Sequence, residues 1–326
     1  MNLLRAPIQQ LEMGDRAFDL GFARRTDMLR RSVAAVGVLQ PLVVRQRADG
    51  RYQIVCGFGR ASAAHDLGLA ELPVFVLDMG VSDADCLRLA LFDNLPHRQF
   101  NPIERAIILT RFGPYVDREH LISDYMPLLG MRASAARLDR TRALTNLIDR
   151  LKWAVAEGRM EEKVGVSLAL LSGDDQGALA ELLDRCQPSV SMVREWADAL
   201  ADIARRDGTT VREILAKPEM SAALSAADMT TAERTAAVRR GIHCLRFPTL
   251  SAHEARFNEG RAALRLPPTM QLEPAPNFES DEMRLAIRFR NQAELRNAMD
   301  VLSRWFDDPN LLGSLWFPAR PADHTS

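Results

Sequence analysis

Residues 52–68 constrain the fold more than any other stretch, because they pass from a strand pattern through a glycine turn into a helix pattern. Tyr52 to Cys56 reads as a strand, the turn Gly57-Phe-Gly-Arg60 follows, and the helix ends near Gly68. The free N–H groups and the positive dipole end of such a helix suit an anion such as phosphate. The guanidinium of Arg60 adds a planar donor for phosphate oxygens. Tight packing of the turn is the structural alternative.

Composition decides which partners the whole chain can attract. The net charge is −1, from 42 basic and 43 acidic residues, so a contact with nucleic acid needs a local basic face. The four cysteines have no paired spacing, which argues against a zinc ribbon or a disulfide framework and fits a reducing compartment. No apolar run is long enough to span a membrane. We therefore expect a soluble, cytoplasmic protein with no membrane partner, and its 326 residues suggest roughly two or three domains.

The flanking segments predict a mixed α+β domain. Residues 1–25 look irregular, with Ile8 and Leu11 as candidate anchors of a short strand. Thr26 is the candidate N-cap of a helix through Val36, with Gly37 as its stop. Strands are expected at 42–44 and, after a turn at 48–50, at 52–56. The apolar run 72–77 predicts a buried strand, and Ser82 is expected to cap the next helix.

Four motifs follow one another in this region. They are Gly37-Val-Leu-Gln40-Pro41-Leu-Val-Val44, Gly57-x-x-Arg60, Asp93-Asn94-Leu-x-x-Arg98 and Asn101-Pro102-Ile-Glu104-Arg-Ala. In this order and spacing they resemble the ParB N-terminal domain, over residues 1–110. The resemblance implies the ParB/sulfiredoxin-type α+β fold with a nucleoside triphosphate site. In chromosome-partition ParB proteins the nucleotide is CTP, held with Mg²⁺; ATP is the alternative.

The resemblance assigns the phosphate loop to Gly57, Phe58, Gly59 and Arg60. The family usually has Gly-Glu-Arg-Arg there, so Phe58 stands for the glutamate and Gly59 for the first arginine. Gly57 and the last arginine are kept. The loss of one arginine leaves less charge to balance a triphosphate.

The remaining nucleotide contacts also follow from the resemblance. Asp93 and Asn94 stand where the family has Glu-Asn, associated with magnesium and the triphosphate, so both are candidate metal ligands. Asp93 is the candidate catalytic residue. Gln40 falls near the base and ribose, and Arg98 completes the set of nucleotide-binding candidates.

Each of these residues also has a purely structural interpretation. The glycines would only allow the turn, Asp93 and Asn94 would be a polar pair at a helix end, and Arg98 a surface charge. The sulfiredoxin branch of the fold has a reactive cysteine at the position of Phe58. Cys56 instead belongs to the buried strand and reads as an inert core residue, which argues against a sulfiredoxin-like reductase.

The middle of the chain resembles the region in which ParB proteins carry a helix-turn-helix. Asn101-Pro102 opens a helix to about Phe112, Pro127 is expected to break the next one, and Ser134 is expected to cap a long helix running to Val155. Basic residues dominate between Met131 and Lys152. The candidate DNA-binding residues are Arg132, Ser134, Arg137, Arg140 and Arg142. A solvated arginine face is the alternative.

The whole chain is interpreted as α+β, with a ParB/sulfiredoxin-like N-terminal domain, a helical middle with a helix-turn-helix-like segment, and a small α+β C-terminal module. The expected limits are 1–100 for the nucleotide-binding domain, 101–187 for the helical DNA-binding domain, 188–247 for a helical scaffold, 248–318 for the α+β module and 319–326 for a tail. The module contains an expected hairpin and a closing helix, and is the candidate dimerisation region.

The leading hypothesis is a ParB-like, nucleotide-gated, DNA-associated protein of partition, plasmid maintenance or gene regulation. DNA, a second copy of the chain and a partition ATPase are the expected partners, at the nucleoid or on a plasmid. One alternative is a Mg²⁺-dependent nucleotide-hydrolysing or phosphotransferring enzyme of the same fold, organised by Asp93. Another is a DNA-binding or scaffold protein whose nucleotide site has decayed.

Overall fold

The protein divides into two compact units in a computed structural model that describes residues 2–22 and 27–307. The units are Met1–Ala197 and Asp198–Ser326, and the division falls within α11 (Val190–Asp207). Across the described ranges, no helix has both the length and the apolar character that crossing a bilayer requires. The finer subdivision at residues 100, 187 and 247 stays a prediction.

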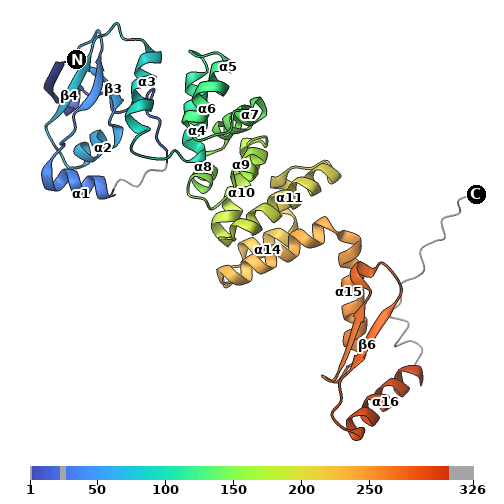
Figure 1. Cartoon of the computed structure of the whole chain (residues 1–326). Helices are drawn as coiled ribbons and strands as arrows, with labels where there is room; N and C mark the ends of the chain where they lie inside the picture. The colour runs from blue at the N-terminus through green and yellow to red at the C-terminus, as the bar shows by residue number, and fades with distance from the viewer. Residues whose placement is uncertain (1, 23–26, 308–326) are drawn as a thin grey trace, which may run out of the picture. The chain divides into compact units, whose positions relative to one another are not determined.

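The first unit opens with a mixed four-stranded sheet (Figure 1). Its strands are β1 (Asn2–Pro7), β2 (Leu42–Gln46), β3 (Tyr52–Cys56) and β4 (Glu71–Leu77), in the order β1-β4-β2-β3. β2 runs parallel to β4, whereas β1 and β3 are antiparallel to their neighbours. The predicted α+β class of this domain is confirmed.

The irregular start predicted for residues 1–25 is wrong, because β1 occupies Asn2–Pro7. Its first four residues are exposed on an edge strand, so the sequence there lacks the alternation of apolar and polar residues that marks a half-buried strand. Ile8 instead begins a 3₁₀ turn, η1 (Ile8–Gln10), and Leu11 makes a single bridge to Tyr52. Pairing with the distant strand β4, which sets Ala6 opposite Leu72, defines this strand.

Three helices accompany the sheet. They are α1 (Asp27–Val36), α2 (Phe58–Asp66) and α3 (Asp83–Asn94). α1 packs on α2, and α3 packs on β3. Gly37, at φ +74°, follows α1 as predicted. The Ser82 hydroxyl caps α3 by accepting from the backbone N–H of Asp85 at 3.1 Å. Thr26, expected to cap α1, lies outside the described residues.

The helical middle continues the same apolar core, which includes buried residues from Ala6 to Leu138. Its elements are α4 (Pro102–Phe112), α5 (Arg118–His120), a π-helical turn η2 (Leu121–Tyr125), α6 (Met126–Leu128), α7 (Ala135–Ala143), a 3₁₀ turn η3 (Leu144–Asn146), α8 (Asp149–Ala156), α9 (Glu162–Leu168) and α10 (Gly173–Cys186). The predicted start of α4 is confirmed, with a full capping box between Asn101 and Glu104.

The helix that Pro127 is predicted to break ends one residue later than expected, at Leu128. The chain stays helical from Arg118 to Leu128, and Pro127 lies in the first turn of α6. The Met126 N–H bonds to the carbonyl of Leu121, which is the wider hydrogen-bond spacing of a π turn. Proline has no N–H to leave unpaired, and the wider turn just before it makes room for its ring.

The single long helix predicted from Ser134 to Val155 is also wrong. It ends at Ala143, and Leu147 and Ile148 adopt extended backbone angles. The Ile148 N–H donates to the Oε1 of Gln176, a buried side chain of α10, at 2.8 Å. The contact with Gln176 gives the Ile148 N–H a hydrogen-bond partner outside its own helix. Because that partner is distant in the sequence, local periodicity could not locate the break.

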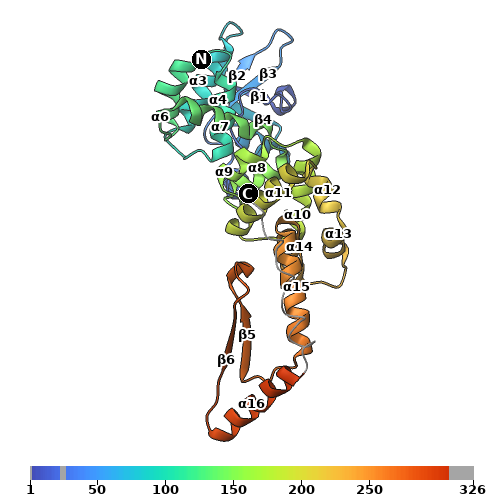
Figure 2. The ribbon, with the colours of Figure 1, turned by 90° about the vertical axis from the view of Figure 1, so that its right-hand side faces the viewer.

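The second unit consists of short helices followed by a small α+β module (Figure 2). Its elements are α12 (Val211–Ala216), α13 (Pro218–Ser225), α14 (Thr231–Arg246), α15 (Pro248–Ala263), β5 (Met270–Pro274), a 3₁₀ turn η4 (Pro276–Phe278), β6 (Met283–Ile287) and α16 (Gln292–Asp307). β5 and β6 form the predicted antiparallel hairpin, and α16 is the predicted closing helix. Residues 319–326, the expected tail, lie outside the described residues.

Candidate nucleotide site and nucleic-acid interface

The turn between β3 and α2 has the geometry that the sequence predicts. Gly57 caps α2 at φ +96°, and a Cβ there would lie 3.0 Å from Leu42 Cγ. The first backbone bond of the helix runs from Ala61 to the Gly57 carbonyl. The N–H groups of Phe58, Gly59 and Arg60 therefore form its first turn and have no partner within the helix. Gly59 and Arg60 belong to the helix itself rather than to the loop before it.

Arg60 extends its guanidinium toward the segment between α1 and β2. Its Nη1 donates to the backbone carbonyls of Gln40 at 2.8 Å and Pro41 at 3.2 Å. Its Nη2 lies 4.0 Å from Asp93 Oδ2, at the end of α3. One arginine thus connects three of the four sequence motifs.

A cavity of about 270 Å³ lies at this junction. Seven of the eight predicted nucleotide or metal residues line it: Gln40, Gly57, Phe58, Gly59, Arg60, Asp93 and Asn94. These residues come from three separate segments between positions 40 and 94, and the sheet and α3 bring them to one place. The sequence predicted that these seven residues belong to one site. Their roles in binding stay a prediction.

Arg98 does not line the cavity with the other candidates. Its Nη1 donates to Glu104 Oε1 at 2.6 Å, and its Nε donates to Asn94 Oδ1 at 3.0 Å. The guanidinium also lies over the Phe100 ring, 4.5 Å from the centroid. Glu104 is buried and also accepts from the backbone N–H of Phe22 and Asn101. Arg98 therefore serves as the counter-ion of a buried carboxylate.

Sequence reasoning missed the wall formed by residues 18–20 and by His97. The Phe18 ring is buried, and the Arg45 guanidinium lies over it, 5.2 Å from the centroid. Asp19 accepts from Arg16 Nη1 at 2.9 Å. The segment looked irregular in sequence, and no local pattern marks a residue whose neighbours come from β2.

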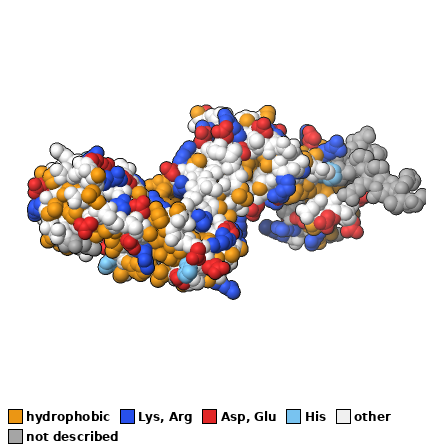
Figure 3. Space-filling view, turned by 90° about the horizontal axis from the view of Figure 1, so that it is seen from above, with side chains coloured by type: hydrophobic (Ala, Val, Ile, Leu, Met, Phe, Trp, Pro, Cys, Tyr) orange, Lys and Arg blue, Asp and Glu red, His pale blue; other side chains and the backbone are white. Residues whose placement is uncertain are grey.

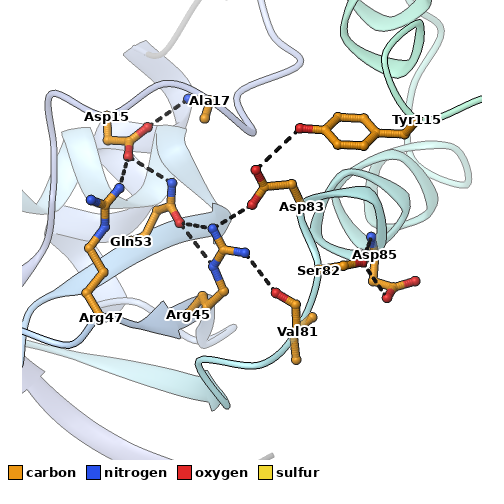
Figure 4. Close-up of polar contacts among 10 residues, drawn as sticks. All are labelled: Asp15, Ala17, Arg45, Arg47, Gln53, Val81, Ser82, Asp83, Asp85 and Tyr115. Atoms are coloured by element: carbon orange, nitrogen blue, oxygen red, sulfur yellow. Dashed lines mark hydrogen bonds and ion pairs between the residues drawn. The ribbon is translucent and has the colours of Figure 1, made fainter.

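Arg45 is the centre of a polar network that fixes this wall (Figure 4). It donates to Gln53 Oε1 from both Nε and Nη2, and pairs with Asp83 Oδ1 at 2.7 Å. Gln53 in turn donates to Asp15 Oδ2 at 2.8 Å, and Tyr115 donates to Asp83 Oδ2 at 3.3 Å. The network joins residues 15–17, which lead into the wall, to the sheet, α3 and the segment after α4.

Cys56 lies in the cavity lining but is not poised for thiol chemistry. Burial, reinforced by the charge of Asp93, raises the pKa of the Cys56 thiol to about 12. The thiolate is the nucleophilic form, so such a group is unreactive near neutral pH. The predicted inert character of Cys56 agrees with this environment.

A Mg²⁺ ion would find one carboxylate with suitable access. The Asp93 side chain is half-exposed and faces the cavity lining, and Mg²⁺ in such sites takes one or two carboxylates plus substrate phosphates. The Asn94 amide is already used by the Ala90 carbonyl and by Arg98. No cluster of three His, Cys, Asp or Glu side chains suited to a metal occurs within 2–22 and 27–307. The residues therefore fit a metal held by Asp93 together with a ligand's phosphates, and fit Asn94 less well.

The helix-turn-helix-like segment is formed by the helical run 118–128, a turn and α7. Ser134 caps α7 by accepting from the Arg137 N–H at 3.4 Å. α7 has nine residues, a length suited to insertion into a major groove. Arg118 and Asp139 pair through two hydrogen bonds of 2.7 and 2.6 Å and hold the run 118–128 to α7.

The candidate DNA-binding arginines do not share one face. Arg132 and Arg140 are exposed and Arg137 is half-buried. Arg137 and Arg140 line a cavity with Lys163, Glu161 and Glu162 of the α9 region. Arg142 points instead toward the end of α4, where a Cβ on Gly113 would lie 2.7 Å from its Nη2. On the face that Figure 3 shows, basic and acidic side chains are interspersed.

Comparison with known proteins finds the same family that the motifs indicate. Residues 19–95 match the ParB N-terminal domain. The chain is 31% identical over 147 residues to a probable chromosome-partitioning protein ParB of Pseudomonas putida, covering 45% of this chain and 48% of that protein. It is 42% identical over 110 residues to the probable chromosome 2-partitioning protein ParB of Deinococcus radiodurans, covering 32% and 36%. The matches thus span about half the length of these relatives or less.

Among solved structures, two of Caulobacter crescentus ParB match. One, complexed with CTP-γ-S, is 25% identical with a TM-score of 0.27, covering 56% of this chain and 99% of that chain. The other, complexed to the centromeric parS site, is 24% identical with a TM-score of 0.32, covering 60% and 98%. A Pnob8-like ParB-N domain is 13% identical, with a TM-score of 0.35.

Proposed function

The chain carries a ParB N-terminal domain at residues 19–95, and from this premise we propose that it is a nucleotide-gated, DNA-associated protein of partition, plasmid maintenance or gene regulation. The proposal rests on one observation: Gln40, the first turn of α2, Arg60 and Asp93 all line the same cavity. The ParB names of its sequence relatives support the same class.

The nucleotide would place a phosphate at the first turn of α2. Three backbone N–H groups, the helix dipole and the Arg60 guanidinium converge there. CTP is the expected nucleotide, with ATP as the alternative, and Asp93 would hold Mg²⁺ through the bound phosphates. The base would lie toward Gln40.

Gating would follow from the present partners of Arg60. Its Nη1 holds the carbonyls of Gln40 and Pro41, which lie between α1 and β2. A phosphate that takes over this guanidinium releases the two carbonyls. The bound and free proteins then differ in how α1 is held, and a ligand with unequal affinity for two states shifts their populations. A second copy of the chain and a partition ATPase are the partners on which such a switch would act, at the nucleoid or a plasmid.

The test is calorimetric titration with CTP, ATP and GTP in Mg²⁺. Arg60→Ala removes charge-assisted hydrogen bonds to phosphate and should weaken binding about 10- to 100-fold. Arg60→Lys should retain part of the affinity. Arg88→Ala, which removes an exposed arginine of α3 outside the cavity, is the matched control. If no nucleotide binds the wild-type protein, the proposal fails.

A decayed nucleotide site is the alternative that a specific observation favours. The positions of Phe58 and Gly59 carry no charge, and the Phe58 ring is buried under the Arg16 guanidinium. In that case DNA binding would persist in Arg60→Ala and no nucleotide would alter it. A hydrolysing enzyme would instead show phosphate release that Asp93→Ala abolishes, and binding without turnover would count against it.

A further inference from the structure

The charge around the cavity is unusual for a site that would hold several phosphates. Arg60 is the sole Arg or Lys among the described residues that line it, and the lining also includes the carboxylates of Asp19 and Asp93. Part of the Arg60 charge is already balanced, because Asp93 Oδ2 lies 4.0 Å from its Nη2. Asp19 is balanced by Arg16, which does not line the cavity.

Two positions that could supply a second cation do not. Gly59, the second residue of α2, lines the cavity without a side chain. Arg98 is paired with Glu104, six residues further along the chain, whose side chain is 2% exposed and whose Oε1 lies 2.6 Å from the Arg98 Nη1. Moving Arg98 to a ligand would leave the Glu104 charge buried without that partner, which strongly disfavours the move.

One phosphoryl group uses the sole guanidinium of the described cavity lining. It can take Arg60 and the first turn of α2, and His97 is the other described lining residue whose side chain can carry positive charge. Without Mg²⁺, each further phosphoryl group adds negative charge beside Asp93 and Asp19. The volume of about 270 Å³ also lies below the roughly 300–1,000 Å³ of pockets for drug-sized ligands.

We infer that this site recognises its nucleotide through a single phosphoryl group and does not distinguish a nucleoside triphosphate from the corresponding mono- or diphosphate. This inference rests on the proposed function and specifies the ligand class of the same cavity. A consequence is that cleavage of the β–γ bond would not empty the site. The switch would then report the occupancy by all phosphorylated forms of one nucleoside, and hydrolysis would not reset it.

The experiment compares cytidine, CMP, CDP and CTP on the full chain by isothermal titration, with Mg²⁺ and with EDTA. We expect the dissociation constants of CMP, CDP and CTP to agree within about fivefold, and cytidine to bind at least about tenfold more weakly than CMP. A CTP constant more than about fivefold below that of CMP, in Mg²⁺ or in EDTA, overturns the inference and leaves the proposed function intact. If none of the four cytidine ligands binds, the same comparison is made with adenosine, AMP, ADP and ATP, and failure of both series removes the inference and the proposed function together.

A gain-of-charge variant tests the physical cause. Gly59→Arg adds a guanidinium to the cavity lining, and its Cβ would meet only the end of the Leu29 side chain, at 3.1 Å. We expect this variant to favour CTP over CMP by about tenfold. Gly59→Gln supplies a long side chain without the charge and should keep the CTP to CMP ratio near one, whatever it does to each affinity. Equal ratios in the two variants would contradict the argument.

Discussion

At the residue scale, Gly57 and Gly59 look alike in the sequence but have different requirements. Gly57 is left-handed at φ +96° and lies against Leu42 and Arg60, whereas Gly59 has an ordinary helical backbone. Only the first position excludes other residues by conformation. The sequence motif contains both glycines and does not show this difference in backbone conformation.

Gly57→Ala should therefore destabilise the N-terminal domain by about 1–3 kcal/mol, because alanine is strained at this φ and its Cβ crowds Leu42. It should also weaken nucleotide binding, since it moves the first turn of α2. Gly59→Ala is the matched control and should change the free energy of unfolding by less than about 1 kcal/mol. Urea unfolding measures both, and equal losses would show that the strain argument is wrong.

At the element scale, α7 is shorter than the sequence predicts, and its role as a recognition helix stays a prediction. The sequence suggested one helix to Val155, too long for that role, but the helix ends at Ala143, before α8. The structure also separates the candidate DNA-binding arginines. Near α9, Arg140 is exposed and Arg137 is half-buried, while Arg142 packs toward Gly113.

We predict that Arg137→Ala and Arg140→Ala each weaken DNA binding across all sequences and lower the slope of log affinity against log salt by about 1. Both side chains would contact phosphates rather than base edges. Arg159→Ala, an exposed arginine paired with Glu157, is the control. Fluorescence anisotropy across a salt series gives the slope. Slopes that match the wild type in both variants would remove this face from the DNA interface.

At the scale of the whole molecule, the N-terminal part of the first unit and the C-terminal module have separate apolar cores. The first core includes buried residues from Ala6 to Leu138, and the C-terminal core joins Phe257 of α15 to the hairpin and to Trp305 of α16. Each core can therefore be weakened separately. Phe257 is 4% exposed and its ring lies edge-on to Phe278, 5.9 Å between centroids.

Phe257→Ala should cost the C-terminal module about 3–5 kcal/mol, through lost burial and the cavity left behind. Scanning calorimetry of the full chain should then show a lower transition temperature for the second unit and an unchanged one for the first. Gly57→Ala should give the reverse pattern. A single transition that both variants shift equally would mean that the two units unfold together.

The sequence by itself determined the features that depend on neighbouring residues. Gly57 at the start of α2, Ser82 before α3 and the Asn101–Glu104 capping box all follow from contacts within four residues. The order of the four motifs also predicted which residues line the cavity, because a shared fold brings them together. The hairpin and closing helix at the C-terminus followed from their periodicity.

The tertiary structure alone decided the features that depend on distant partners. β1 exists because β4 pairs with it, and Phe18 forms a wall because Arg45 covers it. The helix after Ser134 ends at Ala143, and Gln176 holds the extended Ile148 that separates it from α8. Arg98 matches the nucleotide motif, yet the buried Glu104 carboxylate holds its guanidinium. Local sequence patterns indicate the secondary structure that each segment prefers. Which charged group pairs with Arg98 depends instead on which group is buried, and burial is a property of the whole fold.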